Sequence, residues 1–195
     1  MSTLFVNNLN TASGSTITLP TGKQLIGTDT NSIKAPGMVV QFAHRDPTGS
    51  FVNQVTSGST SYVNTNYSIT ITPKYANSVI LVIGDFQLGM ANAYNDYSYL
   101  TLKRVISGGA TTDLGHQTSG GVNYGVAARG GTNAYEWDSQ TFTFPDKPNT
   151  TNAVTYQVWV RNNASSRNVY IGWTSTSNNT FTHNGCFLNA IEIAQ

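Results

Sequence analysis

Hydrophobic and polar residues alternate along much of this chain with the period of two that is typical of β-strands. Residues 67–72 place Tyr67, Ile69 and Ile71 on one side and small hydroxyl side chains on the other, as expected of a strand with one wet face. Helical spacing of apolar residues is not seen. The pattern predicts strands at 38–43, 67–72, 78–88, 97–106, 122–126, 136–144, 154–161, 169–173 and 187–193. Strands at this spacing predict an all-β fold, an antiparallel β-sandwich of jelly-roll type.

The longest apolar run, Val79 to Ile83, holds five consecutive apolar residues, four of them β-branched. Such a run predicts a strand that is covered on both faces. Val79, Leu81 and Ile83 then share one face, and Ile80 and Val82 share the other. We expect one set to line the core of the domain and the other to be covered by another layer or by another chain. The pattern does not say which set is which.

Residues 1–37 differ from the rest of the chain in composition and in the spacing of apolar residues. Short apolar pairs alternate there with turn-type residues, and Phe5 is the only aromatic residue. Such a segment cannot bury much apolar surface alone, so it is either a loose tail or a stalk in which several copies share their few apolar side chains. We favour the stalk. The sequence Ala35-Pro36-Gly37 predicts a boundary, which gives an extended N-terminal stalk or attachment segment at 1–37 and a β-sandwich knob at 38–195.

Composition supports an all-β fold and argues against several classes of function. Only 10% of the 195 residues are charged, the net charge is +1, and there are 18 Gly and 10 Tyr. The sequence has no stripe of Lys or Arg that would predict nucleic-acid binding. It also has no apolar segment that approaches the roughly 20 residues of a membrane span. The N-terminus lacks the pattern of a secretory signal, so we expect synthesis in a reducing cytoplasm. Cys186 stands alone and is expected in the core or an interface.

The chain resembles a family of C-terminal β-rich, jelly-roll-like domains in structural proteins of tailed bacteriophages, especially marine phages and cyanophages. The resemblance implies a fibre, spike or head-decoration subunit that forms a homotrimer and is located in the virion. In such a trimer one sheet of each copy faces the threefold axis, which would cover the second face of the run at 79–83. The segments that carry the resemblance are Ser2–Leu9, Ile69–Pro73, Ser78–Val82, Leu100–Arg104, Thr111–Gly115, Phe144–Pro148, Ala153–Val158 and Leu188–Ala194.

Catalytic and metal-binding motifs are not seen in the sequence. No nucleophile elbow, zinc-protease motif, phosphate loop or calcium loop is present. His44 near Asp46 reads as part of an exposed turn, and His183 near Cys186 is too small a set for a metal site. A glycan depolymerase would need paired carboxylates in a groove, which this sequence does not indicate. We therefore expect a protein that is not an enzyme and that uses no cofactor or metal.

Glycan binding is the better-supported alternative, because sugars suit aromatic platforms beside carboxylates. Two segments next to predicted loops have that composition. The alternative to glycan binding is that Trp137 begins a strand and packs in the core. The candidate glycan contacts are Tyr94, Asp96, Tyr97, Tyr135, Trp137 and Asp138.

The sequence as a whole predicts a non-enzymatic phage virion protein that acts through homotrimer assembly and surface display. The alternative is a receptor- or glycan-binding tip of a tail fibre. The expected partners are other copies of the chain, other virion proteins through the N-terminal segment and, in the alternative, host surface polysaccharide.

Overall fold

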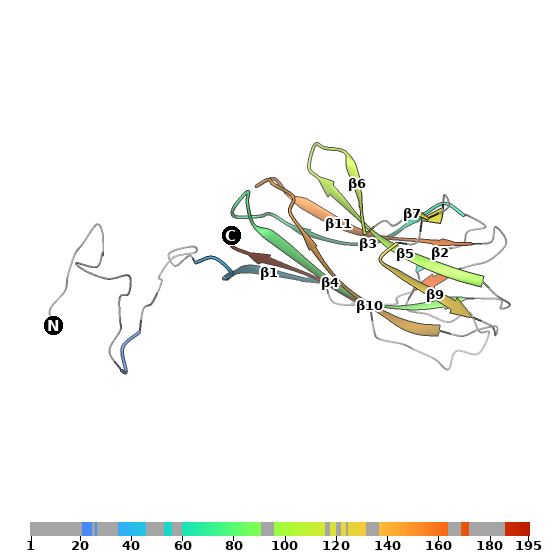
Figure 1. The fold of residues 1–195 in the computed structure, drawn as a ribbon, viewed down its shortest axis with the longest axis horizontal. Coiled ribbons are helices and arrows are strands. Elements are labelled where there is room, and N and C mark those ends of the chain that lie inside the picture. Colours follow the sequence, from blue (N-terminus) through green and yellow to red (C-terminus); the bar gives the residue numbers. More distant parts are fainter. Residues whose placement is uncertain are drawn as a thin grey trace. The chain divides into compact units, whose positions relative to one another are not determined.

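The computed structural model describes residues 21–24, 26, 35–45, 53–55, 60–90, 96–115, 118–119, 122–123, 125–131, 137–163, 169–171 and 186–195. The chain divides into two compact units, Met1–Ile33 and Lys34–Gln195. The second unit contains the strands of the described residues and is the knob described below (Figure 1).

Thirteen strands form in the described ranges, and helices do not occur there. The strands are β1 (Val39–Arg45), β2 (Asn53–Val55), β3 (Val63–Ile71), β4 (Val79–Met90), β5 (Asp96–Ile106), β6 (Thr111–Leu114), β7 (Thr118–Ser119), β8 (Val122–Asn123), β9 (Ala127–Gly131), β10 (Trp137–Asp146), β11 (Val154–Asn162), β12 (Val169–Ile171) and β13 (Phe187–Ile193).

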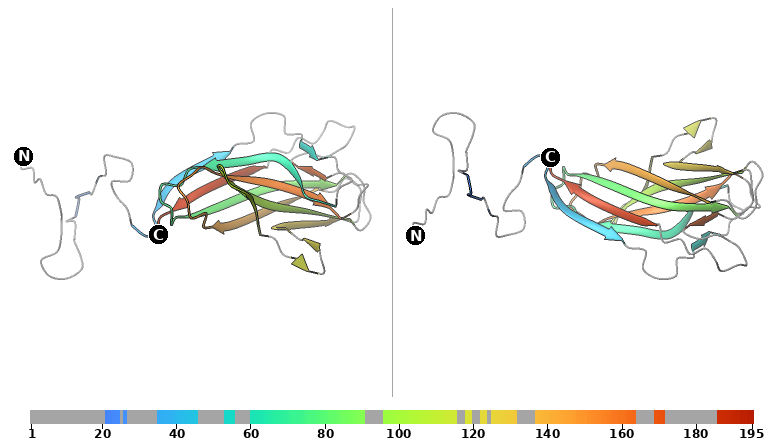
Figure 2. Two further views of the ribbon diagram at one scale, coloured as in Figure 1. Left: turned by 90° about the horizontal axis from the view of Figure 1, so that it is seen from above. Right: turned by 90° about the horizontal axis from the view of Figure 1, so that it is seen from below.

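Two antiparallel sheets face each other in a sandwich, as Figure 2 shows from two sides. Sheet A contains the order β1-β13-β4-β10, with β12 and β2 extending it beside the far end of β4. Sheet B has the order β3-β11-β5-β6, and β9 continues the edge that β6 begins. Each sheet interleaves early and late strands of the chain, which is the arrangement of a jelly roll. The predicted all-β, jelly-roll-like sandwich is confirmed.

The apolar run at 79–83 lies in β4, the central strand of sheet A. β10 pairs with one side of β4 over ten residues, and β13 and then β12 pair with the other side. Gly84 interrupts the apolar run because the Phe142 ring occupies the space of a side chain there. A Cβ atom at residue 84 would lie 2.6 Å from Cζ of Phe142. The glycine therefore lets the Phe86 and Phe142 rings stack with centroids 6.0 Å apart.

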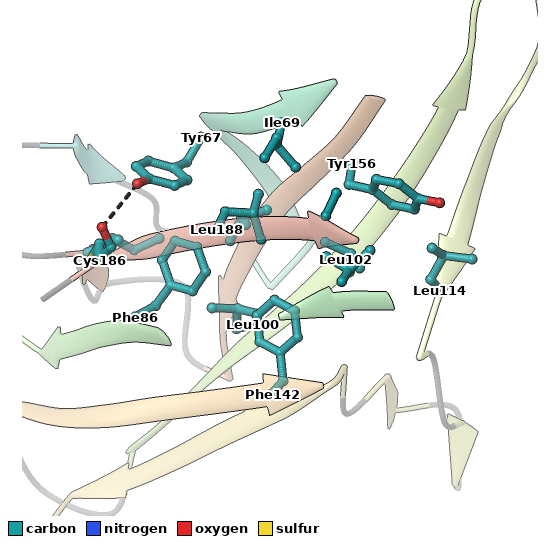
Figure 3. Packing of buried hydrophobic residues seen from close by; sticks show 14 of the residues in the cluster. Tyr67, Ile69, Phe86, Leu100, Leu102, Leu114, Phe142, Tyr156, Cys186 and Leu188 are labelled. Carbon is teal, nitrogen blue, oxygen red and sulfur yellow. Dashed lines mark hydrogen bonds between the residues drawn. The ribbon is translucent and has the colours of Figure 1, made fainter. Parts of the chain in front are cut away.

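The hydrophobic core lies between the inner faces of the two sheets (Figure 3). The side chains that alternation predicted to face inward in β3, Tyr67, Ile69 and Ile71, are all buried. Tyr67 packs edge-on against Phe86 with ring centroids 5.2 Å apart, so that one ring from each sheet meets in the middle. Burying a large apolar side chain stabilises the fold by about 1.5–3 kcal/mol, so these contacts between the sheets hold the sandwich together.

A buried carboxylate closes the end of the knob where β1 begins and β13 ends, which we call the base. The fully buried Glu192 of β13 accepts hydrogen bonds from the N–H groups of Lys74 and Tyr75 at 2.9 and 3.1 Å. It also accepts bonds from Ser78 Oγ at 2.7 Å and Gln41 Nε2 at 2.6 Å. Burial by itself would raise the pKa of Glu192, but these four donors hold it below its ordinary value of 4.5.

A second buried carboxylate joins the two sheets. Asp146 of β10 pairs with the guanidinium of Arg104 at 2.7 Å and accepts a hydrogen bond from Tyr156 Oη at 2.8 Å. Arg104 and Tyr156 are cross-strand neighbours in sheet B, whereas Asp146 belongs to sheet A. Burial and the adjacent Asp146 carboxylate raise the pKa of Tyr156, so its hydroxyl stays protonated and acts as a donor.

The predicted strands are present where the structure describes them, with two differences. The strand predicted at 136–144 continues through Pro145 to Asp146. Proline is tolerated there because β10 lies at an edge of sheet A, where a missing N–H breaks no bond within the sheet. In addition, only 122–126 was predicted as a strand between residues 107 and 135, yet β6, β7 and β9 form there besides β8.

Candidate functional site: the outer face of sheet A

The outer face of sheet A, which we call the A face, carries a continuous group of apolar side chains. Strand pairing places Phe42, Ile191, Leu81 and Pro145 side by side in one row across all four strands. Residues paired in this way point to the same side of a sheet. The A face comprises the apolar residues Val39, Phe42, Val79, Leu81, Ile83, Pro145, Phe187, Ile191 and Ile193.

The two faces of β4 differ sharply in burial. Ile80 and Val82 are fully buried in the core, whereas Val79, Leu81 and Ile83 are only partly covered. The even-numbered set therefore lines the core of the knob, and the odd-numbered set belongs to the A face. This settles the question that the sequence left open for the core, while the subunit interface predicted for the other set stays a prediction.

The A face is most exposed along β1. Phe42 is 58% exposed and Val39 is 57% exposed, although both are large apolar side chains. The apolar side chains of β4 and β13 beside them are partly exposed. A contiguous exposed apolar surface of this kind marks a site of interaction on a soluble protein.

Two pairs of polar side chains on the A face bond to each other. His44 stacks on Phe42 with ring centroids 5.9 Å apart, and its Nδ1–H donates to the Asn189 side-chain carbonyl oxygen. Asp85 of β4 accepts a hydrogen bond from Ser139 Oγ of β10. Such pairing lowers the free-energy cost of covering these groups, because a polar atom that keeps its hydrogen-bond partner costs little to bury.

The outer face of sheet B, the B face, has a polar surface. Thr70 and Thr155 share a hydrogen bond of 2.8 Å across β3 and β11. Lys103 pairs with Asp113 at 3.1 Å, and its Nζ lies 4.0 Å above the Trp159 ring. The B face thus presents hydroxyl and charged groups to solvent, which is the ordinary character of a sheet with one wet face.

The described candidate glycan contacts lie at the end of the knob away from the base, which we call the tip. Asp96 of β5 pairs with Gly131, and Trp137 of β10 pairs with Gly89, so both predicted segments reach the same end. The ring of Tyr97 is 49% exposed, and Asp138 is also exposed. Tyr94 and Tyr135 and the side chains of Asp96 and Trp137 lie outside the described part. Whether any of these residues contacts a glycan stays a prediction.

Sequence reasoning missed an arginine held between aromatic rings near the tip. The guanidinium carbon of Arg161 lies 4.1 Å from the Tyr99 ring centroid and 5.5 Å from that of Tyr62. Tyr97 stacks next to Tyr99 with centroids 6.4 Å apart. Burial raises the pKa of Tyr62, although its hydrogen bond with Arg161 acts in the opposite direction. Tyr62, Tyr99 and Arg161 are far apart in the chain, and the pairing of β11 with both β3 and β5 brings them together.

The remaining sequence candidates give no reactive site among the described residues. Cys186 is a buried free thiol, as predicted, and burial raises its pKa from 9.0 to about 11. Asp46, His116 and His183 lie outside the described part. Within that part, no group of three or more His, Cys, Asp and Glu side chains is placed to hold a metal ion. The described residues likewise contain no helix long and apolar enough to span a membrane.

No protein-family description and no curated protein matches this chain. Among solved structures, a chain in "Structure of infectious bursal disease virus Gt strain" is similar to 88% of this chain, with 14% sequence identity and a TM-score of 0.46. The similarity covers 42% of the viral chain, so this chain spans less than half of that chain's length. A similarity this distant carries no information about function.

Proposed function

We propose that this protein is a non-enzymatic structural protein of a bacteriophage virion, of the fibre, spike or decoration type. It forms a homotrimer through the A face and displays its knob at the virion surface. Residues 1–37 form the stalk or attachment segment that meets other virion proteins. The proposed virion context rests on the sequence resemblance, and the proposed assembly rests on the A face.

The observation that carries the proposal is the difference between the two sides of β4. Six of the apolar residues on the A face lie on β4 and β13, where the sandwich itself leaves them partly exposed. Covering one large apolar side chain is worth about 1.5–3 kcal/mol, so covering Val39 and Phe42 alone would contribute several kcal/mol to association. A second copy supplies a matching apolar surface, and the Asp85 carboxylate on this face already accepts a hydrogen bond from Ser139.

Imaging of the virion tests the virion role directly. Particles labelled with an antibody against the knob should carry the label at their surface, in groups that contain three copies each. Label over the whole head would identify a decoration protein, and label at the tail would identify a fibre or spike. Absence of the protein from purified particles would contradict the proposal.

A receptor- or glycan-binding tip is the second candidate function, favoured by the exposed side chains of Tyr97 and Asp138 at that end of the knob. The exposed ring of Tyr97 offers a flat surface on which a sugar ring could stack. A glycan array with the intact protein should then show binding that Tyr97→Ala weakens at least tenfold. Thr70→Ala on the B face is the matched control and should bind as the wild type does. Lack of binding by the folded wild-type protein would leave assembly and display as the whole function.

A further inference from the structure

Among the described residues, sheet A has β10 at one edge, and β1 and the short β2 at opposite ends of the other edge, with no partner strand beyond them. In that part of the chain, β1 pairs with β13 alone and β10 pairs with β4 alone. An edge strand carries a row of backbone donors and acceptors that can pair with another chain. The two edges therefore indicate where sheet A could be extended.

The direction of each backbone group follows from two hydrogen bonds at the base. Ala194 N–H donates to Met38 O at 2.9 Å, and Gly37 N–H donates to Ala194 O at 2.8 Å. Backbone groups alternate in direction along an antiparallel strand, so the even-numbered residues of β13 face β1 and the odd-numbered ones face β4. The odd-numbered residues of β13 pair with odd-numbered residues of β4, so the even-numbered residues of β4 direct their backbone groups toward β10. Their partners on β10 are also even-numbered, so the even-numbered residues of β10 direct their backbone groups toward β4.

The odd-numbered residues of β10 consequently direct their backbone groups away from the sheet. Ser139, Thr141 and Thr143 each present an N–H and a C=O at the edge, and their side chains are small and exposed. Pro145 falls in the same series, which explains why a residue without an N–H is accommodated in a paired strand. On β1, the same reasoning directs the backbone groups of Phe42 away from β13.

The neighbouring edge of sheet B is closed in a way that the edges of sheet A are not. Arg45 of β1 donates to the carbonyl oxygens of Ser68 at 2.7 Å and Asn66 at 3.5 Å. Gln41 of β1 donates to Thr72 O at 2.6 Å. Long side chains thus occupy the acceptors along the edge of β3, which is one way in which proteins prevent unwanted strand pairing. The described residues show no such cover over β10.

We propose that β1 of one copy pairs antiparallel with β10 of the next copy, so that the sheets A of three copies join edge to edge in a closed ring. The proposal rests on the homotrimer proposed above. β1 and β10 run in opposite directions within sheet A, because each of the three intervening pairings is antiparallel. Rotation about an axis parallel to the strands keeps those directions, so β1 meets the neighbour's β10 in the antiparallel sense.

Two features of sheet A favour this pairing over contacts between identical edges. Pairing β10 with β10 about the same axis would be parallel, and a twofold contact would leave the β1 edge open. The apolar row across sheet A also ends in Phe42 on β1 and in Pro145 on β10. Joining these edges makes the row continuous from one copy to the next, so edge pairing and burial of the A face occur together.

Disulfide trapping tests the pairing. Phe42→Cys is combined in turn with Thr141→Cys, Thr143→Cys and Pro145→Cys, because residues must have Cα atoms about 4.4–6.8 Å apart to form a disulfide. After mild oxidation, at least one double variant should run as a covalent trimer on a non-reducing gel. Each single variant and the wild type, whose own Cys186 is buried, should run as monomers.

The other outcomes overturn the proposal in distinguishable ways. Dimers from the Thr143→Cys single variant would show that β10 meets β10. A trimeric mass in solution without any cross-link in the double variants would refute the edge pairing and leave the proposed trimer intact. A monomeric wild type would refute both proposals.

A proline substitution at the edge gives an independent test. Thr141→Pro removes an N–H that faces away from β4, so the knob should keep its circular dichroism spectrum while its mass in solution falls to that of one copy. The matched control, Thr141→Val, keeps the N–H and should remain a trimer. A folded Thr141→Pro variant that stays trimeric would contradict the pairing, and if this variant fails to fold, the cross-linking result decides.

Discussion

The two outer faces of this sandwich belong to sheets of similar construction, yet their chemistry is opposite. On the B face, Thr70 bonds to Thr155 and Lys103 pairs with Asp113, so the polar groups are satisfied and remain in contact with water. On the A face, apolar side chains such as Phe42 extend across four strands. The fold needs only the inner faces to be apolar. The apolar A face therefore points to a requirement beyond folding, which we assign to contact between copies.

The largest expected effect comes from a charge on the inner side of β4. Ile80→Asp places a carboxylate in a fully buried position without a partner, which costs more than about 4–5 kcal/mol. Because small domains are stable by only about 5–15 kcal/mol, the knob should fail to fold. Circular dichroism should show loss of the β signal. A folded Ile80→Asp protein would show that this position does not line the core.

A charge on the outer side of the same strand should separate assembly from folding. Leu81→Asp lies in the middle of the apolar row of the A face but outside the core. The variant should keep the β signal, and its mass in solution should fall to that of one copy. A trimeric Leu81→Asp variant would show that the A face is not the interface.

The buried carboxylate at the base gives a third prediction, which concerns stability without assembly. Glu192→Gln removes the charge that four donors stabilise and should lower the free energy of unfolding by about 1.5–3 kcal/mol at neutral pH. Neither outer face changes, so the variant should keep the mass of the wild type. If the mass of Glu192→Gln in solution falls below that of the wild type, the A face is not the sole determinant of assembly.

The pH dependence of this effect has a defined sign. The folded state lowers the pKa of Glu192 below 4.5, so it favours the charged form. This contribution is fully present above the ordinary pKa and is lost as the pH falls through the lower pKa of the folded state. The difference in melting temperature between the wild type and Glu192→Gln should therefore shrink on acidification below 4.5. A difference that stays constant to strongly acidic pH would contradict the assigned hydrogen bonds.

The smallest effect is expected on the B face. Lys103→Ala removes a partly exposed ion pair with Asp113 and the contact of the ammonium with Trp159, which together are worth about 1 kcal/mol. Thermal unfolding should report this small loss, and the mass in solution should be unchanged. If Lys103→Ala dissociates the protein, the B face takes part in assembly and the contrast between the two faces fails.

Alternation in the sequence predicted the strands that carry most of the core. Tyr67, Ile69 and Ile71 were assigned to one buried side by their spacing alone, because a period of two reports which residues share a face. The short strands β6 and β9 could not be found in this way. Their residues are rich in Gly and Thr, and both strands form by pairing with β5, a partner that local sequence does not reveal.

The A face was only half predictable. The run from Val79 to Ile83 indicated that both sides of β4 are apolar, but either set could have faced the core. The choice depends on tertiary packing, in which the rings of Phe86 and Tyr67 meet on the even-numbered side. The exposed Phe42 joins the A face only through the pairing of β1 with β13, which connects opposite ends of the chain.

The mass of the intact protein in solution tests the central claim most directly. Light scattering coupled to size-exclusion chromatography at micromolar concentration should give a value near three times the chain mass of 21.0 kDa. A single species of 21.0 kDa would mean that the A face stays uncovered, and it would contradict the account.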